Sequence, residues 1–554
     1  MGRGDAARIL VLVSILEAAC AKLPSPQESY GGPVNSCGAD GDCAEGSCDT
    51  SMGVCTVAGA GGRSYIVKVI PDPAQSVPSQ VFEVVLDAAG KADAPLVVNR
   101  PLTVIGRALA GGSEGEALNA RVIFTESGLV LPGRPPRITV YEAEGRSRDY
   151  RVDLLPGLYR ITVIPGGTQA SRYPVFYLDD VEVAPTHRRV DLVLPAFEGL
   201  VAVEGRVRRG GWPVDGLTIE AIDGQTSRVV STASVTGCEG GSQNGPCGSF
   251  SMRLAPDVSA FSLRISRPDE PSYPTTVVSG FEVEPGASAV DLTDDAALSL
   301  AALGAPLRYR ARVEKPVELS SGGTSFDPAP SCLVVFESDD VARGKVTRSV
   351  TTNESGDLET VSGVLGIDLY PAEYRVTVIP PEAPSGATAD YAILSYPDPI
   401  TISGSSPIGG QVFSLPLRPV LAGSVTAGGS PMPLSTLAAE PHGSADAPMR
   451  SSTSTTADDG TYFLPVDMGL YSMVAEAPPQ SGFAWGRTLT TVTGSGELDV
   501  ALPIPFVARA RLHSEAVDVG GAVVEWYEER DGAAYAVARV TADGSGNVTA
   551  LLPP

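Results

Sequence analysis

The chain has 554 residues, of which 43% are hydrophobic and 19% are charged. This balance supplies enough apolar residues for packed cores and excludes a disordered chain. The formal net charge of −25 repels phosphate backbones, so no nucleic acid is expected as a partner. At ~150 residues per domain, the length indicates about four domains.

Residues 1–20 follow the order of a secretory signal peptide. Arg3 and Arg8 give a basic start, residues 9–16 form an apolar run, and small residues follow. The apolar run is much shorter than the ~20 residues that a membrane-spanning helix needs, and no other stretch is typical of a span. The start of the chain therefore predicts export, and an uncleaved start is the least favoured alternative.

The string LEAAC, which ends at Cys20, resembles the lipobox of bacterial lipoproteins. In that family the Cys carries the lipid, so the resemblance implies a membrane anchor on Cys20 and a place in the outer membrane. Glu17 departs from the family pattern, which usually has Leu there. Ala19 and Ala21 alternatively fit the A-x-A site of ordinary signal peptidase, which would give a freely secreted protein.

Residues 21–61 are expected to form a flexible tether and a cysteine-rich motif. Its cysteines are Cys37, Cys43, Cys48 and Cys55. In an exported chain such an even set indicates two disulfides, since so short a piece cannot build an apolar core. Zinc is disfavoured because no C-x2-C pair occurs, and the acidic residues between the cysteines lack the spacing of a calcium-binding EF-hand. The pattern resembles the cysteine-rich motif of many myxobacterial surface lipoproteins, and also Dickkopf-like segments.

Three further cysteines lie in the later part of the chain. Cys238 and Cys247 flank a polar, glycine-containing loop, and a local disulfide is the simplest interpretation. Cys332 has no evident partner and lies on a predicted strand, where we expect a buried thiol.

One strand motif recurs along the chain, and no amphipathic helix is evident. Its aromatic anchors are Tyr65, Tyr159, Phe261, Tyr374 and Tyr471. Alternation places each anchor and every second residue after it on one face, and a Pro then ends the strand. Successive anchors are about 100 residues apart, which is the size of a small β-sandwich.

Two further markers accompany this motif. An acidic, glycine-containing turn precedes the anchor strand, and a strand with a small residue opens each unit. The small residues are Gly106, Gly205, Ala311, Gly423 and Ala510. Together the markers resemble carboxypeptidase regulatory-like domains, and more loosely transthyretin-like and collagen-adhesin B-type folds. The resemblance covers roughly residues 63–554 and implies non-catalytic antiparallel sandwiches that act as spacers, stabilising modules or adhesion modules.

The expected fold is therefore all-β, with tandem antiparallel sandwiches at residues 104–202, 203–307, 308–420 and 421–506. Residues 62–103 hold only the later strands of a unit, so the first unit is predicted to be partial. Residues 507–554 hold only the earlier strands, so the last unit is predicted to be truncated. Either the gene product is incomplete there, or a partner completes the unit by adding a strand.

Signals for catalysis are weak, and no catalytic residue is predicted. His187, His442 and His513 lie in different units, which argues against a zinc peptidase. The G-x-S-x-G match at residues 111–115 lies in a predicted hairpin loop and lacks the helix of a nucleophile elbow. Lys315 is the one lysine at a position to test for the Lys–Asn crosslink of some adhesin B-type domains.

No cofactor or metal is predicted either. Acidic turns at Asp458, Asp459 and Asp543 could touch calcium, but Asp and Gly are also the ordinary residues of such turns. The three tryptophans are interpreted as core residues or, less often, as sugar-stacking platforms; they are Trp212, Trp485 and Trp526.

These features favour a non-catalytic, exported structural or adhesive stalk, which would be rigid and elongated in solution. A surface receptor for a glycan or a protein ligand is the first alternative. An accessory subunit of an exported hydrolase is the second.

Overall fold

The computed structural model describes residue 30 and residues 32–554, except for 58–61, 113, 130, 132–135, 144–148, 187–188, 236–246, 271, 319–322, 340–343, 383–389, 404–408, 443–448 and 531. Regular structure in these residues consists of β-strands and a few single-turn 3-10 segments. No helix among them has the length and apolar character to cross a membrane. The fold class is all-β, built of β-sandwiches, as the alternating residue pattern predicted.

Four sandwiches, units A to D, follow one another along the chain, and each surrounds its own apolar core. Unit A comprises β6 (Leu102–Ala110), β7 (Glu116–Ala117), β8 (Ala120–Glu126), β9 (Ile138–Ala143), β10 (Asp149–Leu154), β11 (Gly157–Pro165), β12 (Phe176–Val183) and β13 (Leu192–Leu194). Unit B comprises β14 (Val201–Arg206), β15 (Arg208–Arg209), β16 (Trp212–Pro213), β17 (Thr218–Asp223), β18 (Val229–Ser234), β19 (Ser249–Leu254), β20 (Ala260–Ser266), β21 (Thr276–Glu282), β22 (Ala289–Leu292) and β23 (Ser299–Leu300).

The next two units have the same plan. Unit C comprises β24 (Leu307–Glu318), β25 (Thr324–Pro328), β26 (Leu333–Ser338), β27 (Val346–Thr352), β28 (Leu358–Glu359), β29 (Ile367–Leu369), β30 (Ala372–Ile379), β31 (Leu394–Ser395), β32 (Ile400–Ile402) and β33 (Gly409–Ser414). Unit D comprises β34 (Val420–Ala427), β35 (Ser430–Pro431), β36 (Thr436–Pro441), β37 (Ser452–Thr455), β38 (Thr461–Pro465), β39 (Gly469–Glu476), β40 (Gly486–Val492), β41 (Gly496–Glu497) and β42 (Val500–Leu502).

Each unit packs a four-stranded or larger sheet against a sheet built on its opening strand. In unit A the sheets have the orders β12-β11-β8-β9 and β10-β6-β13, and in unit D the sheet that corresponds to the first has the order β40-β39-β36-β37. The opening strand pairs in parallel with a strand from the end of the same unit, as β6 does with β13 and β34 does with β42. The chain must therefore return beside its own first strand to complete a unit.

The fifth sandwich is made from both ends of the chain, and we call it the closing sandwich. Its N-terminal half is β3 (Ser64–Ile70), β4 (Gln80–Val85) and β5 (Leu96–Val97). Its C-terminal half is β43 (Phe506–His513), β44 (Val523–Arg530), β45 (Ala533–Thr541) and β46 (Asn547–Leu552). The sheets have the orders β4-β3-β44-β45 and β46-β43-β5, which repeat the plan of units A and D.

The prediction of two incomplete end units is therefore wrong. Residues 64–97 supply the anchor strand and the returning parallel strand that the unit beginning at Phe506 lacks. The two predicted fragments are one sandwich whose last three strands come first in the chain. An elongated string of domains is also excluded for this structure, because the last unit returns to the first.

The anchor aromatics have the role that their spacing predicted, since all five are buried. The hydroxyl of Tyr159 donates a hydrogen bond to the carbonyl of Leu155 at 2.8 Å, and that of Tyr374 donates to Tyr370 at 3.0 Å. Both bonds reach back four residues along the chain. The anchor thus fills the core and ties its strand to the preceding turn.

The small residue of the opening strand has a steric cause. A Cβ added at Gly106 would lie 1.9 Å from the carbonyl oxygen of Val190, in the segment that returns beside β6. At the equivalent Gly423 in unit D, the added Cβ would lie 2.0 Å from the carbonyl oxygen of Leu498. A side chain at either place would force the returning segment away from the opening strand.

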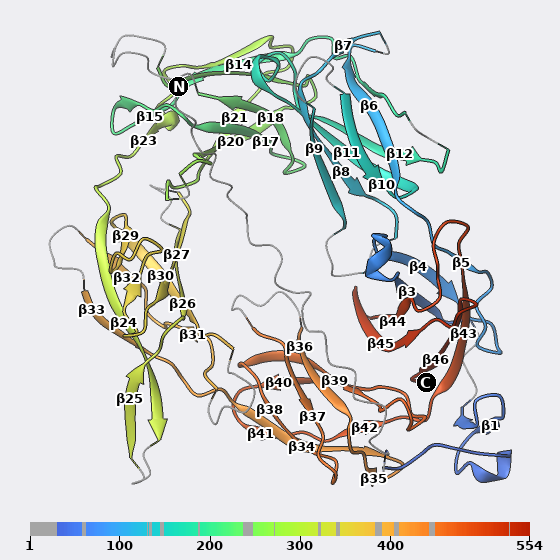
Figure 1. Cartoon of the computed structure of the whole chain (residues 1–554). Coiled ribbons are helices and arrows are strands. Elements are labelled where there is room, and N and C mark those ends of the chain that lie inside the picture. The colour runs from blue at the N-terminus through green and yellow to red at the C-terminus, as the bar shows by residue number, and fades with distance from the viewer. Residues whose placement is uncertain are drawn as a thin grey trace, which may run out of the picture.

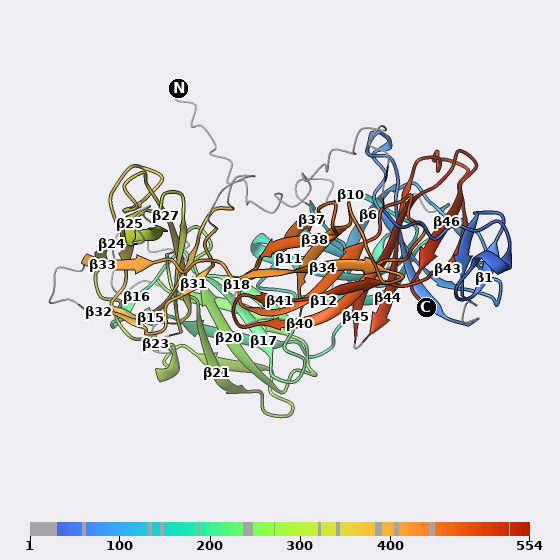
Figure 2. The same cartoon turned by 90° about the horizontal axis from the view of Figure 1, so that it is seen from below.

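The five sandwiches form a closed circuit, with the blue N-terminal strands beside the red C-terminal strands (Figure 1). Seen from below, the body is flatter than it is wide (Figure 2). Neighbouring units touch: Val175 of unit A donates a backbone hydrogen bond to Val230 of unit B at 2.9 Å. Units B and C exchange two backbone hydrogen bonds between Thr275 and Lys345, at 3.0 and 2.8 Å.

Candidate functional site: the closing sandwich and the disulfide segment

The core of the closing sandwich joins aromatic residues from the two ends of the chain. Trp526 is fully buried, and its ring centroid lies 6.0 Å from that of Tyr65 in an edge-to-face arrangement. The ring centroid of Phe506 lies 6.2 Å from that of Tyr65. Edge-to-face aromatic pairs are favourable beyond their burial alone. Because one core contains residues of both halves, each half depends on the other for its apolar cover.

Backbone pairing joins the halves in both sheets. Residues 66–70 of β3 lie antiparallel to residues 523–527 of β44, and β5 lies parallel to β43. The segment just before β5 also pairs with Arg509 of β43. Arg509 donates its backbone N–H to the carbonyl of Gly90 at 2.7 Å, and its own carbonyl accepts the N–H of Ala92 at 2.8 Å. Both β3 and β44 are interior strands, so removing the N-terminal half would leave β44 with an open edge.

Polar side chains add to this contact. The ammonium of Lys68 lies 3.2 Å from the carboxylate of Glu525 on the neighbouring strand. The side-chain amide of Gln75 donates to the carbonyl of Asp518 at 2.8 Å and accepts the N–H of the same residue at 3.0 Å. These bonds fix the register between the two ends.

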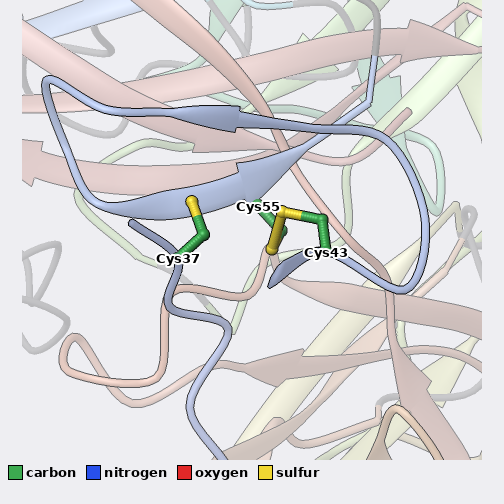
Figure 3. A group of neighbouring side chains, drawn as sticks. All are labelled: Cys37, Cys43 and Cys55. Carbon is green, nitrogen blue, oxygen red and sulfur yellow. A yellow bond between two sulfur atoms is a disulfide. The ribbon is translucent and has the colours of Figure 1, made fainter. Parts of the chain in front are cut away.

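The cysteine-rich motif forms a compact disulfide segment, which we define as residues 32–57. Disulfides join Cys37 to Cys48 and Cys43 to Cys55 across a small hairpin of β1 (Ser47–Asp49) and β2 (Val54–Thr56). Figure 3 shows the Cys43–Cys55 bond, with the sulfur of Cys37 nearby. Three sulfurs of this cluster lie within 4.8 Å of one another. All of them are oxidised in disulfides, so this cluster offers no thiolate to a metal.

The disulfide segment lies against both unit D and the closing sandwich. Asn35 is buried; its N–H donates to the carbonyl of Ser481 at 2.7 Å, and its side-chain amide donates to that of Gly482 at 2.9 Å. At the other end, Val57 donates to the carbonyl of Pro505, the linker into β43, at 2.9 Å. The segment therefore fastens the N-terminal region to the two units at the end of the chain.

An ion pair between Asp49 and Arg509 completes this docking. Partial burial works against ionisation of Asp49, but hydrogen bonds from Ser51 and the charge of Arg509 outweigh it and lower the pKa of this carboxyl. In the sequence, Asp49 is one of the acidic residues between the cysteines that lack the spacing of an EF-hand. Its contact with a residue 460 positions away depends on the tertiary fold.

A buried ionic network fixes the junction of units C and D. The carboxylate of Asp467 accepts from Arg450 at 2.9 Å and lies 3.4 Å from Arg418, which also pairs with Asp390 at 2.7 Å. Burial alone would raise the pKa of Asp467, but its hydrogen bonds and the two arginines lower it. Arg450 also donates to the carbonyl of Tyr391 of unit C at 2.6 Å, so the network spans the junction.

The junction of unit D with the closing sandwich is aromatic and charged. His442 stacks on Tyr535 with ring centroids 5.6 Å apart, and the guanidinium of Arg487 lies 3.9 Å from the centre of the same ring. Burial raises the pKa of Glu476 at the end of β39. His442 is thus part of a packed junction and has no partner histidine there.

A cleft of about 370 Å³ lies between the closing sandwich and unit A. Its lining includes Lys68, Gln80 and Phe82 from one side, and Glu126, Leu131 and Arg137 from the other. Arg137 donates across this junction to the carbonyl of Ser79 at 2.6 Å. With this hydrogen bond, each pair of neighbouring sandwiches in the closed circuit has a direct contact.

The remaining predicted cysteine sites have different outcomes. Cys20 and Cys238 lie outside the described residues, so lipidation and the Cys238–Cys247 disulfide stay predictions. Cys247 itself is buried. Cys332 lies in the core of unit C, as expected, and burial raises the pKa of its thiol, which disfavours the nucleophilic thiolate.

The other sequence candidates are not brought together into one site. His187 lies outside the described residues, and His513 is exposed at the end of β43. Residues 111–115, apart from the undescribed Ser113, form the turn between β6 and β7, where no helix follows. The ammonium of Lys315 lies 5.9 Å from the ring centre of Tyr391.

The acidic turns serve as turn caps. The hydroxyl of Thr461 donates to Asp459 at 2.6 Å, and the side-chain amide of Asn547 donates to Asp543 at 3.0 Å. Together with the backbone N–H groups of the same two residues, which donate at 3.0 and 2.8 Å, these bonds lower the pKa of both carboxyls. Among the tryptophans, Trp526 belongs to the core and Trp485 is partly buried, whereas Trp212 is 60% exposed on β16. Trp212 is therefore the one tryptophan with a largely exposed side chain.

Comparison with known proteins gives structural likenesses alone. No family model matches the chain, and no curated protein matches it. The shaft pilin SpaA of Lactobacillus rhamnosus GG is 10% identical, with 35% of this chain and 97% of the pilin covered and a TM-score of 0.17. A streptococcal ancillary pilin is 11% identical, with coverages of 58% and 100% and a TM-score of 0.21. The Bacillus anthracis TIE protein is 11% identical, with coverages of 72% and 74% and a TM-score of 0.15. Likenesses this weak carry no argument about what this chain does.

Proposed function

We propose that the protein is an exported, non-catalytic structural or adhesive surface protein whose five sandwiches act as one closed head. The observation that carries the proposal is the closing sandwich, in which strands from both ends of the chain share one core. Pairing of the ends converts a string of domains into a body with a fixed arrangement of surfaces. Kinship of the units to regulatory-like domains is part of the same proposal, and it rests on the sequence markers alone.

The disulfide segment supports the export part of the proposal. Disulfides persist in oxidising compartments and are rare in the cytosol. Residues 21–29 would connect the head to a lipid on Cys20, which would hold it at the outer membrane.

Metabolic labelling with a palmitate analogue tests the anchor. Wild type should incorporate the label and partition with membranes, and Cys20→Ser should lose the label and be released. Glu17→Leu, which restores the lipobox pattern, is the matched control and should keep the label. Absence of label from wild type and Glu17→Leu alike would overturn lipidation and leave free secretion.

A receptor for glycans is the second candidate, and the exposure of Trp212 favours it. Exposed aromatic faces can stack on apolar faces of sugars, and Trp212 lies beside Arg208 and Arg209 in the β15–β16 hairpin. A glycan array probed with wild type and Trp212→Ala tests this role. Phe463→Ala, at an aromatic residue that is 70% exposed in unit D, is the control and should keep every signal.

A further inference from the structure

We propose that the closing sandwich is also a binding site for a second copy of this chain, in which the N-terminal half of one molecule completes the C-terminal half of another. The partner is defined by the site itself, because the segment that fits is present in every copy. This inference does not depend on lipidation, on adhesion or on any ligand.

The two halves of the closing sandwich are separable parts of one fold. In units A to D the anchor strand directly follows the strand that pairs antiparallel with the opening strand, as β11 follows β10. In the closing sandwich the same step, from β46 to β3, has no peptide connection, since β46 ends at Leu552 and β3 begins at Ser64. Only non-covalent contacts therefore determine which copy supplies the strand.

The acceptor, which is the C-terminal half, would expose an apolar edge. Without β3, strand β44 would present an open backbone edge along residues 523–527, beside the uncovered ring of Trp526. An open apolar edge of this kind is a template for strand addition. The segment whose side chains match that core at this register is residues 64–70 of the same sequence.

The donor comprises the disulfide segment and the N-terminal half. The disulfide segment precedes the N-terminal half, and its contacts with Pro505 and Arg509 reach the same acceptor region. On the other side, the connection to unit A is short, from Val98 to Leu102, and contains Pro101. Short connections of this kind favour exchange of a segment between copies, because a small backbone change redirects the whole segment.

The same contacts form within one molecule or between two, so concentration decides the outcome. During refolding from the unfolded chain, a long flexible linker joins the two halves, and the effective concentration for closure within one chain is then on the order of millimolar or lower. The closed monomer therefore dominates in dilute solution, and exchanged copies form where local concentration approaches that value. Reciprocal exchange gives a dimer, whereas head-to-tail exchange gives an open chain.

Complementation between two full-length variants tests the proposal. Val67→Asp damages the donor strand β3, and Val524→Asp damages the acceptor strand β44; both residues are fully buried. Neither variant can close its own sandwich. However, Val524→Asp keeps an intact donor strand, and Val67→Asp keeps an intact acceptor strand. Mixing them should give a 1:1 complex of twice 57.1 kDa in native mass spectrometry. The double variant Val67→Asp/Val524→Asp, mixed with Val67→Asp, should give none.

A second measurement uses intact strands, in case the charged variants do not fold. Two tagged batches of wild type are unfolded, mixed at about 1 mM and refolded, and each tag should then capture the other. In Lys68→Cys/Glu525→Cys, whose positions face each other across β3 and β44, a disulfide formed before unfolding should prevent capture. The proposal would be overturned if refolded wild type gave no mixed species, or if the crosslinked variant gave as much of them as wild type.

Discussion

Truncation of Trp526 should open the closing sandwich and expose two segments that lie at opposite ends of the sequence. The indole is fully buried and packs against Tyr65 of the N-terminal half, so Trp526→Ala leaves a large cavity between the halves. Substitutions of this kind cost about 3–5 kcal/mol, which corresponds to roughly a hundred-fold or greater increase in the open population. The indole N–H has no hydrogen-bond partner among the described residues, so Trp526→Phe should cost less.

Hydrogen exchange followed by mass spectrometry measures this opening segment by segment. Residues 64–97 and 506–552 should lose protection together and to the same extent, because they form one cooperative unit. Strands β11 and β39, in the separate cores of units A and D, should keep theirs.

Phe336→Ala is the matched control, because Phe336 is also fully buried but lies in the core of unit C. It should deprotect residues 307–414 and leave both halves of the closing sandwich protected. If Trp526→Ala deprotects residues 506–552 while residues 64–97 stay protected, the two ends do not share a core and the reasoning is refuted.

Three further predictions concern other parts of the molecule. Asp467→Asn should remove the charge partner of Arg450, leave Arg418 with Asp390 alone, and cost about 3–5 kcal/mol in urea unfolding. Because the pKa of Asp467 is lowered in the folded state, its contribution to stability is present above about pH 4 and is lost as the pH falls through the folded pKa. If the Asn variant loses as much stability in acid as wild type does, Asp467 is not the group responsible. Gly106→Ala should lower the thermal stability of unit A by displacing the segment at Val190, whereas Gly166→Ala, whose added Cβ has 3.6 Å to its nearest neighbour, should not; equal effects would rule out the steric explanation. Cys37→Ser/Cys48→Ser should destabilise the disulfide segment by about 2–3 kcal/mol and leave β3 protected in hydrogen exchange, and loss of β3 with it would show that the segment is part of the closing core.

Much of the fold could be predicted from local pattern. Alternation within a strand determines which side chains face a core, so the anchors from Tyr65 to Tyr471 were assigned correctly without knowledge of any contact. The same local reasoning identified Cys332 as a core residue. The even set of clustered cysteines indicated two disulfides, but not that Cys37 pairs with Cys48 and Cys43 with Cys55.

The docking of the disulfide segment could not be predicted in this way. Asn35, Asp49 and Arg509 have no distinctive spacing, and their contacts join residues more than 400 positions apart. Polar residues of this kind are typical of any exposed loop until the fold shows what lies opposite them. The ionic network of Asp467 could not be predicted from the sequence for the same reason.

By itself, the sequence determined that the chain builds sandwiches of about 100 residues and that each end holds only some of the strands of a unit. It even contained the complementary pieces, since residues 64–97 hold the strands that residues 506–552 lack. Only the tertiary structure decided that these pieces belong together. The physical reason is that a strand pattern specifies which face is buried, whereas the neighbour across the sheet is chosen by backbone bonds and core packing between residues far apart in the chain.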